Sequence, residues 1–167
     1  DPPALARHHH NLARAMLLSG ETADARAAYE RALQLLRPLD GEVHPDLART
    51  ENSVGLLLQA TGDLTGARER FVRAIAHAGE GDHRESVVAR YNLGTLELRQ
   101  GRPEQARVEL VQALDQAERL LGPSHPLVSE IQIAVGETLL AENKRDAATI
   151  ALERGEKLVK QLEIPSE

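Results

Sequence analysis

Histidines are the side chains of this 167-residue chain best suited to bind a metal ion or to transfer a proton near neutral pH. Residues 8–10 are three consecutive histidines, which on a helix point about 100° apart and do not meet at one metal ion. His44, His83 and His125 occupy equivalent loop positions, where a structural task such as capping the next helix is favoured over catalysis. The histidines therefore predict no metal site and no cofactor.

The other reactive residue types predict no catalysis. The chain has no cysteine, which excludes thiol chemistry and disulfides, and its six serines are scattered without the sharp turn that exposes a nucleophile. Aspartates and glutamates follow the polar faces of the expected helices, and no glycine-rich loop is present to hold a phosphate. We expect a protein that is not an enzyme. Hydrolytic activity is a weaker alternative, which needs a polar pocket with a strongly perturbed acid or base.

The composition favours a folded helical protein. Hydrophobic residues make up 41% of the chain and charged residues 28%, which is enough apolar material for a packed core. Alanine and leucine dominate and only three residues are aromatic. This balance favours closely packed helices and excludes all-β classes.

The charge pattern argues against nucleic acid and membrane partners. The formal net charge is −6, and the 17 arginines and 3 lysines form no basic tail of the kind that binds nucleic acid. No 18-residue apolar run exists, and charged residues such as Arg7 and Arg14 interrupt the first 20 residues, where a signal sequence needs an apolar core. We therefore expect a soluble, cytoplasmic protein. Because the chain starts at Asp1, we also expect it to be a piece of a longer one.

The chain repeats itself four times. Segments that begin at Ala25, Ala67 and Ala106 align residue by residue, and a weaker copy begins at Ala148; these alanines are 42, 39 and 42 residues apart. Within each copy, apolar residues recur at three- and four-residue spacing on both sides of a turn, which is the helical period. Each copy is therefore predicted to be a helix, a tight turn and a second helix. The predicted helices are 4–19 and 22–37, 46–61 and 64–78, 85–100 and 103–121, and 127–142 and 145–162.

Small residues recur at two fixed positions of the repeat. The turn position holds the residue types that most easily adopt left-handed backbone angles, namely Gly20, Gly62, Gly101 and Asn143. Midway along the first helix stand small residues that let the second helix approach, namely Ala13, Gly55, Gly94 and Gly136. Bulky residues of the second helix are expected to fill the remaining space, namely Tyr29, Phe71, Leu110 and Leu152. One copy is too small to bury a stable core alone, so neighbouring copies are expected to stack.

This pattern resembles the tetratricopeptide repeat (TPR) family, which has a small residue in helix A, glycine at the turn, and alanine, an aromatic residue or leucine, and alanine in helix B. HEAT and armadillo repeats lack this pattern of small residues at fixed offsets. The resemblance covers essentially the whole chain and implies an all-α, right-handed superhelical solenoid of four helix-turn-helix repeats with eight helices. It predicts a single array over residues 1–167, with repeats at approximately 3–43, 44–82, 83–124 and 125–163.

The longer period and the loops suggest a subfamily. The 42-residue spacing and the His-Pro loops at 41–47 and 122–127 resemble the kinesin-light-chain-like repeats found in many bacterial signalling proteins. The excess of arginine over lysine together with abundant alanine also points to a bacterial source. The loop of the third copy is shorter and lacks the proline, and Glu97 stands where the other copies have Met16, Leu58 and Leu139.

The resemblance implies that the A helices line a concave groove holding a peptide or partner segment. We expect an acidic ligand, because arginine pairs with carboxylates and asparagine can hydrogen-bond a peptide backbone. The predicted peptide-binding residues are Arg7, His10, Asn11, Arg14, Arg49, Asn52, Tyr91, Asn92 and Arg99. In the fourth repeat Glu130, Ile133 and Glu137 extend the lining, so the groove is expected to be basic in repeats one to three and acidic in repeat four.

Each of these residues also has a purely structural alternative. An arginine on a helix surface is often solvated or paired within its own helix. Tyr91 is either an anchor in the groove or a residue buried between A helices. Sequence alone leaves both interpretations open.

A second hypothesis is self-association, or a regulatory role within a larger bacterial signalling protein such as a kinase. The fourth repeat is degenerate, with Gly155 where the other copies have alanine. Leu158, Val159 and Leu162 prolong its second helix and are expected to stay partly exposed. Exposed apolar surface favours a partner, so a homodimer through this C-terminal helix is expected.

Overall fold

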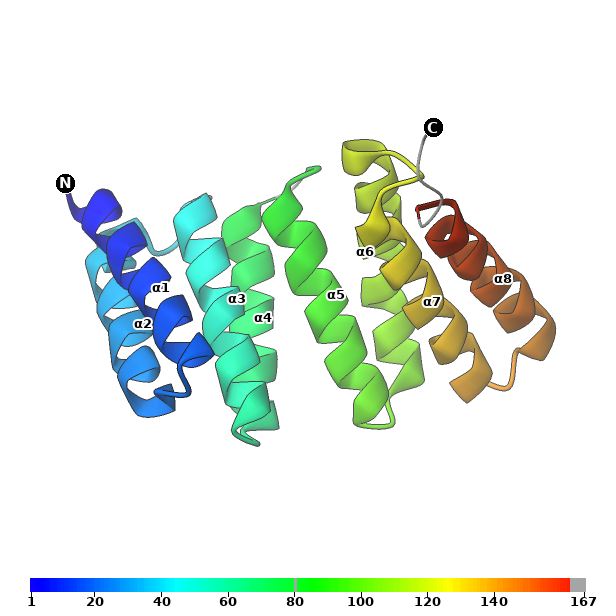
Figure 1. The fold of residues 1–167 in the computed structure, drawn as a ribbon, viewed down its shortest axis with the longest axis horizontal. Helices are drawn as coiled ribbons and strands as arrows, with labels where there is room; N and C mark the ends of the chain where they lie inside the picture. The colour runs from blue at the N-terminus through cyan, green and yellow to red at the C-terminus, as the bar shows by residue number, and fades with distance from the viewer. Residues whose placement is uncertain (80, 163–167) are drawn as a thin grey trace. The chain divides into compact units, whose positions relative to one another are not determined.

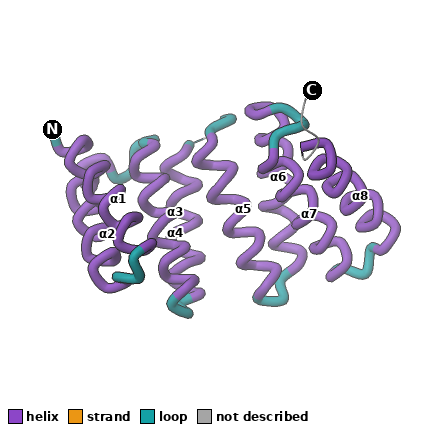
Figure 2. The backbone as a smooth tube through the Cα atoms, viewed as in Figure 1, coloured by secondary structure: helices purple, strands orange, loops and turns teal. Residues whose placement is uncertain are grey.

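The computed structural model describes residues 1–79 and 81–162, and this part of the chain is all-α (Figure 1). Its α-helices are α1 (Pro2–Leu18), α2 (Thr22–Leu36), α3 (Pro45–Ala60), α4 (Leu64–Ala78), α5 (Arg84–Arg99), α6 (Pro103–Leu121), α7 (Pro126–Ala141) and α8 (Arg145–Leu162). A 3₁₀ helix, η1 (Arg37–Leu39), continues α2. The described residues contain no strand (Figure 2), so the predicted all-α class with eight α-helices is confirmed.

The helices pair as the repeats predict. α1 packs on α2, α3 on α4, α5 on α6, and α7 on α8. The chain forms two compact units, Asp1–Glu80 with the first two pairs and Gly81–Glu167 with the last two. Within these units α2 also packs on α3, and α6 on α7. The helical repeat fold is thus established, whereas a single array over residues 1–167 and its right-handed superhelix stay predictions.

The same turn joins the two helices of every pair. In the first, the N–H of Glu21 donates to the carbonyl of Met16 at 2.9 Å, and the N–H of Gly20 donates to the carbonyl of Leu17 at 3.1 Å. These two bonds satisfy carbonyl groups that the helix end leaves unpaired. The turn residues have positive φ values between 60° and 89°, as predicted for Gly20, Gly62, Gly101 and Asn143.

Two loop histidines cap the helix that follows them, as predicted. Nδ1 of His44 accepts a hydrogen bond from the N–H of Asp46 at 3.3 Å, and Nδ1 of His125 accepts one from the N–H of Leu127 at 3.1 Å. His83 precedes α5 at the equivalent position, but its side chain makes no capping hydrogen bond. The capping role therefore holds for two of the three loop histidines.

Glycines midway along the A helices let the B helices lie against the backbone. A Cβ atom added at Gly55 would lie 2.6 Å from the ring of Phe71, and one added at Gly94 would lie 2.5 Å from Cγ of Leu110. Real Cβ atoms essentially never come this close to another heavy atom. The small and bulky residues of the repeat are thus complementary, as predicted.

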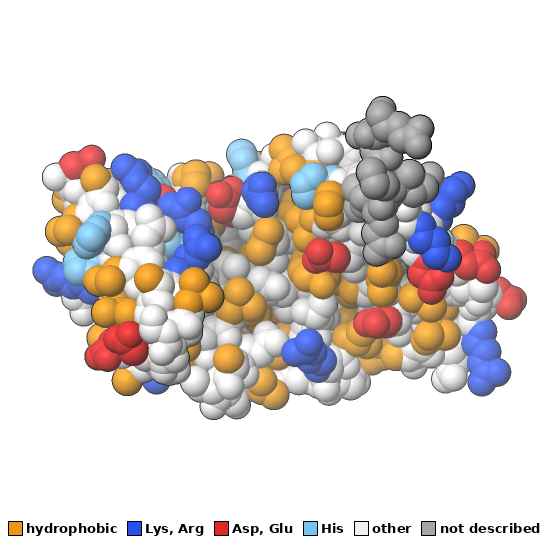
Figure 3. Space-filling view, viewed as in Figure 1, with side chains coloured by type: hydrophobic (Ala, Val, Ile, Leu, Met, Phe, Trp, Pro, Cys, Tyr) orange, Lys and Arg blue, Asp and Glu red, His pale blue; other side chains and the backbone are white. Residues whose placement is uncertain are grey.

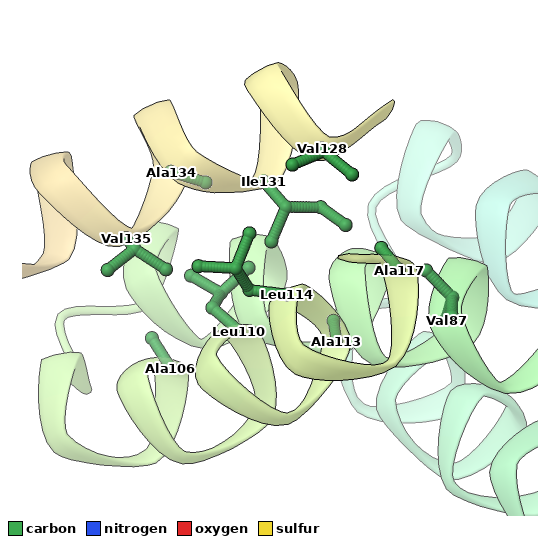
Figure 4. Close-up of a cluster of buried hydrophobic side chains, with 10 residues drawn as sticks. All are labelled: Val87, Ala106, Leu110, Ala113, Leu114, Ala117, Val128, Ile131, Ala134 and Val135. Atoms are coloured by element: carbon green, nitrogen blue, oxygen red, sulfur yellow. The ribbon is translucent and has the colours of Figure 1, made fainter. Parts of the chain in front are cut away.

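Each unit has its own buried apolar cluster. In the first unit, Ala6 of α1, Ala32 and Leu36 of α2, and Leu47 of α3 form one cluster. In the second unit, side chains of α5, α6 and α7 converge (Figure 4), namely Val87, Ala106, Leu110, Ala113, Leu114, Ala117, Val128, Ile131, Ala134 and Val135. These clusters fix the helices whose outer faces are considered below.

The last helix completes the second unit. Gly155 is buried, and a Cβ atom there would lie 2.7 Å from Cγ1 of Ile133, so its lack of a side chain lets α8 approach α7. Leu158 packs against the core of the second unit, and both Leu158 and Val159 are partly exposed, as predicted. The side chain of Leu162 lies outside the described residues.

Glu97 departs from the repeat pattern without being solvated. The residue is only 1% exposed, and its carboxylate pairs with Nε of Arg102. An ion pair thus replaces the apolar contact that the other repeats make there.

Among the described helices, none combines the length and the apolar character needed to cross a bilayer.

Candidate functional site

α1 and α3 present the basic surface that the sequence predicted for the first two repeats, and Lys and Arg side chains gather over these helices in Figure 3. Nη1 of Arg7 lies 3.1 Å from Oδ2 of Asp46, and Arg49 pairs with the other carboxylate oxygen. The two arginine side chains stay 51% and 43% exposed, whereas Asp46 is buried. One carboxylate therefore orients two arginines and leaves an excess of positive charge.

Arg14 adds a third arginine to this surface. It is exposed on α1, and no ion pair among residues 1–79 and 81–162 involves it. Asn11, one turn earlier, is exposed as well. Asn52 on α3 is half-buried and has a polar partner. Arg7, Asn11, Arg14 and Arg49 are thus open to a ligand, and Asn52 is less so.

His10 is the one predicted site residue that the structure buries. Its ring is 2% exposed and packs edge-on against the ring of Tyr29, with the centroids 5.4 Å apart. Nδ1 lies 3.2 Å from Oγ1 of Thr50, whose hydroxyl already donates to the carbonyl of Asp46 at 2.7 Å, so Nδ1 carries the proton and donates. The expectation that His10 is available to a peptide is therefore corrected: its ring joins α1 to α2 and α3.

Burial also keeps the ring of His10 neutral. Loss of solvation, followed by the positive charges of Arg49 and Arg14, lowers the pKa of His10 from 6.5 to about 4, although the carboxylate of Asp46 opposes this shift. At neutral pH the residue is thus an uncharged hydrogen-bond donor within the helix packing.

In the second unit, Tyr91 and Arg99 of α5 line a hollow of about 280 Å³ together with residues of α7. Glu130 and Glu137 of α7 line the same hollow, and Figure 3 shows acidic side chains over this helix. Partial burial, then the negative charges of the two glutamates, raise the pKa of the Tyr91 hydroxyl. The basic side chain of Arg99 on α5 and the acidic side chains of Glu130 and Glu137 on α7 thus line one hollow within this unit.

Tyr91 combines its two predicted roles. Part of the ring packs against the apolar cluster of the second unit, and the rest lines the hollow. Asn92, the next residue of α5, is half-buried and has a polar partner. The structure therefore brings Tyr91 and Arg99 together, with Asn92 beside them in sequence.

A second hollow lies in the first unit and was missed by the sequence analysis. It has a volume of about 370 Å³ and lies between α2, η1, α3 and α4. Leu33 and Leu47 line it together with Arg37, Arg70 and Arg73. The sequence signal that could have indicated this hollow is Arg37, because the third repeat has a glutamate at the equivalent position.

Among the described residues, no group of three or more histidines and acids could hold a metal ion.

Known proteins resemble this chain over its whole length. A model of the tetratricopeptide repeat family matches residues 4–80, 46–108 and 85–161. "Tetratricopeptide repeat protein 19, mitochondrial" from Rattus norvegicus is 32% identical over 106 residues, which are 64% of this chain and 29% of that protein. The chain thus spans less than a third of that relative's length.

Two solved structures share the fold. BtubC (BKLC) from P. vanneervenii matches with a TM-score of 0.85 and 19% identity, over 100% of this chain and 68% of that one. A putative kinesin light chain from Podosopora anserina with nearly identical TPR-like repeats matches with a TM-score of 0.75 and 19% identity, over 98% of this chain and 79% of that one. Since the family model covers nearly every described residue, the chain belongs to the tetratricopeptide repeat family, whose members are typically protein-protein interaction scaffolds.

Proposed function

We propose that this chain is a non-enzymatic interaction module that binds an acidic peptide segment on its A helices. The observation that carries the proposal is the exposed surface of α1 and α3, where Arg7 and Arg49 share the carboxylate of Asp46 and Arg14 belongs to no ion pair in the described part of the chain. An arginine can form two parallel hydrogen bonds to a carboxylate, and the excess positive charge attracts acidic chains. Asn11 on the same surface supplies an amide suited to a peptide backbone.

The hollow of the second unit supports a separate contact. Tyr91 offers a half-buried ring to an apolar side chain, and Arg99 offers a second carboxylate partner. Glu130 and Glu137 favour a basic residue at the same place. The first unit therefore prefers an acidic segment, and the second unit prefers a mixed-charge segment with an apolar residue.

A binding experiment tests the basic surface. Peptides are selected by display on the intact chain, and their affinity is measured by fluorescence anisotropy for the wild type and for Arg14→Glu combined with Arg49→Glu. We expect affinity to fall roughly 10- to 30-fold in the double variant, because two exposed charge contacts become repulsive. Wild-type affinity should also weaken as salt screens these charges.

The matched control carries the same change of charge elsewhere. Arg145 and Lys157 are exposed on α8, so Arg145→Glu combined with Lys157→Glu should leave the affinity within about twofold of the wild type. Replacing the acidic residues of the selected peptide by their amides should reduce binding to the wild type. Equal affinities for both double variants would contradict the proposal.

A specific observation favours self-association as a second function. Leu5 and Leu12 of α1 are 46% and 38% exposed, whereas their repeat equivalents in α3, Leu47 and Val54, are 3% and 6% exposed. In α3 this face packs against the preceding B helix, α2. α1 therefore presents an apolar helix-packing face, which suits a second copy or another part of a larger signalling protein.

Sedimentation across a concentration series tests this alternative. The wild type should gain mass with concentration, and Leu5→Lys combined with Leu12→Lys should remain monomeric. Loss of association only in Val159→Lys would instead assign the contact to the C-terminal helix. A wild type that stays monomeric at every concentration would contradict the self-association hypothesis.

We also propose membership of the kinesin-light-chain-like subfamily of bacterial signalling proteins, which the 42-residue period and the two His-Pro loops support.

A further inference from the structure

The hollow between α2 and α4 is lined by charged residues that the peptide surface does not use. Three are arginines, Arg37, Arg70 and Arg73, and three are acids, Glu30, Asp40 and Glu51. The equal numbers of arginines and acids suggest that the hollow has no net charge. The acids, however, differ from the arginines in how fully they are paired. The partners of each side chain decide what charge the hollow presents.

Glu51 is engaged inside the hollow. Its side chain is only 6% exposed, and its carboxylate accepts a hydrogen bond from Nη1 of Arg70 at 2.8 Å and lies 4.0 Å from Nη1 of Arg73. The contact to Arg70 is close and shielded, whereas Arg73 lies at the outer limit of an ion pair with 60% of its side chain exposed. Glu51 therefore compensates Arg70 and leaves most of the charge of Arg73 available.

The two acids at the rim have partners of their own. Glu30 accepts a hydrogen bond from Nε of Arg26 at 3.1 Å, and Oδ1 of the exposed Asp40 lies 3.4 Å from Nε2 of His77, a contact that is an ion pair only when the imidazole is protonated. Arg37 is exposed and belongs to no ion pair in the described part of the chain. Arg37 and Arg73 thus carry the positive charge of the hollow that has the least compensation.

The second unit has residues of opposite charge at the repeat positions equivalent to Arg37 and Arg73, and there they form an ion pair. Counted from the aligned bulky residue of each B helix, Arg37 corresponds to Glu118 and Arg73 corresponds to Arg154. In the second unit Nη2 of Arg154 donates to Oε1 of Glu118 at 2.6 Å and joins α6 to α8. The first unit has arginine at both positions, so the acceptor that closes this link in the second unit is missing there.

We propose that the hollow between α2 and α4 binds an oxyanion, a carboxylate or phosphate group of a ligand, held by Arg37 and Arg73. The anion takes the part that Glu118 plays in the second unit. Both guanidinium groups line the same hollow, and both are planar donors suited to two-pronged hydrogen bonding. Leu33 and Leu47 give the carbon atoms next to the anionic group an apolar surface. This site lies on other residues than the peptide surface of α1 and α3.

The experiment titrates the intact chain with sodium phosphate and with sodium acetate, at constant ionic strength set by sodium chloride. The readout is the ¹H–¹⁵N signal of the arginine Nε–H groups, assigned by substitution. We expect saturable shifts confined to Arg37, Arg73 and Arg70. A larger response to phosphate assigns a phosphorylated ligand, and an equal response to both anions assigns a carboxylate.

Two reciprocal variants make the test specific. Arg37→Glu recreates the pair found in the second unit, so it should weaken phosphate binding about tenfold or more while preserving the fold. Glu118→Arg places two arginines in the second unit and should add a phosphate response at Arg154. Thermal unfolding confirms that both variants fold. A wild type without saturable shifts, or shifts that persist unchanged in Arg37→Glu, would overturn the proposal.

Discussion

Burial of His10 makes the first unit sensitive to acid. Its pKa is lowered from 6.5 to about 4 in the folded chain, so between these values the unfolded state binds a proton that the folded state does not. The contribution of His10 to stability is therefore complete above pH 6.5 and is lost as pH falls toward 4. We expect the free energy of unfolding to drop by about 2 to 3 kcal/mol across this window on account of His10.

Urea unfolding at a series of pH values checks this expectation. His10→Gln should be less stable at pH 7 but should lose less stability than the wild type between pH 6.5 and 4. His8→Gln is the control, since that residue is exposed on the same helix. Parallel pH profiles for the wild type and His10→Gln would show that His10 does not carry the effect.

The glycine of the third repeat is held by its neighbours. Alanine is the better helix former by about 1 kcal/mol, yet a Cβ atom at Gly94 would lie 2.5 Å from Cγ of Leu110 and 3.2 Å from the carbonyl oxygen of Ala106. We expect Gly94→Ala to destabilise the chain by about 1 to 3 kcal/mol in thermal unfolding. Adding Leu110→Val should recover part of the loss if the clash is the cause. A stabilised Gly94→Ala chain would refute the close-approach interpretation.

Residue roles were predictable where a local rule applies. The positive φ of Gly20 and Asn143 follows from backbone sterics at a helix end, which needs no knowledge of the rest of the chain. The burial of His10 was not predictable, because it depends on Tyr29 and Thr50, which lie 19 and 40 residues away in the sequence. Sequence spacing placed His10 on a surface, and tertiary contacts covered it.

At the scale of the helix pair, two repeats use the same ion pair with its charges exchanged. Nη1 of Arg70 lies 2.8 Å from Glu51 between α3 and α4, and Nη1 of Arg90 lies 2.6 Å from Glu109 between α5 and α6. Glu51 and Arg90 occupy the same repeat position on the A helix, as Arg70 and Glu109 do on the B helix. In these two repeats the position therefore holds opposite charges without fixing which helix carries which.

Exchanging the charges of the third repeat tests this equivalence. Arg90→Glu or Glu109→Arg alone should cost about 2 to 4 kcal/mol, because each leaves two like charges in a partly buried place. The double variant should regain most of that loss, and a double-mutant cycle in urea measures the coupling. Additive losses would mean that the pair contributes no specific interaction.

The helices themselves were predictable, whereas their side-chain chemistry was less so. The three- and four-residue spacing of apolar residues located all eight helices to within about two residues, since this spacing records which side faces the core. The extension of α2 by η1 and the hollow beside Arg37 were not predictable, because they depend on how separate helices end and face one another. The basic surface of α1 and α3 was predicted, but the part of Asp46 in orienting it was not.

At the scale of the whole molecule, each compact unit contains one tyrosine, and the chain has no tryptophan. In a Tyr91→Phe chain the fluorescence of Tyr29 reports on the first unit. In a Tyr29→Phe chain the fluorescence of Tyr91 reports on the second unit. Gly55→Ala forces a Cβ atom to within 2.6 Å of the Phe71 ring, inside the first unit. We expect this change to lower the urea midpoint seen by Tyr29 more than that seen by Tyr91, since repeat stability is a sum of local terms.

Fluorescence titration of the two single-tyrosine chains, each with and without Gly55→Ala, measures both midpoints. Equal shifts at Tyr29 and Tyr91 would mean that the two units unfold in one transition, and the difference expected here would then be absent.

The exchanged ion pairs also bear on how a chain of similar hairpins avoids assembling in the wrong order. During folding, α3 could meet α6 instead of α4, because the A and B helices of both repeats carry the same small and bulky residues. That error would set Glu51 against Glu109, and the complementary error would set Arg90 against Arg70. Mutual repulsion within each mismatched hairpin thus gives α3 and α5 a means of rejecting each other's B helix before the core closes.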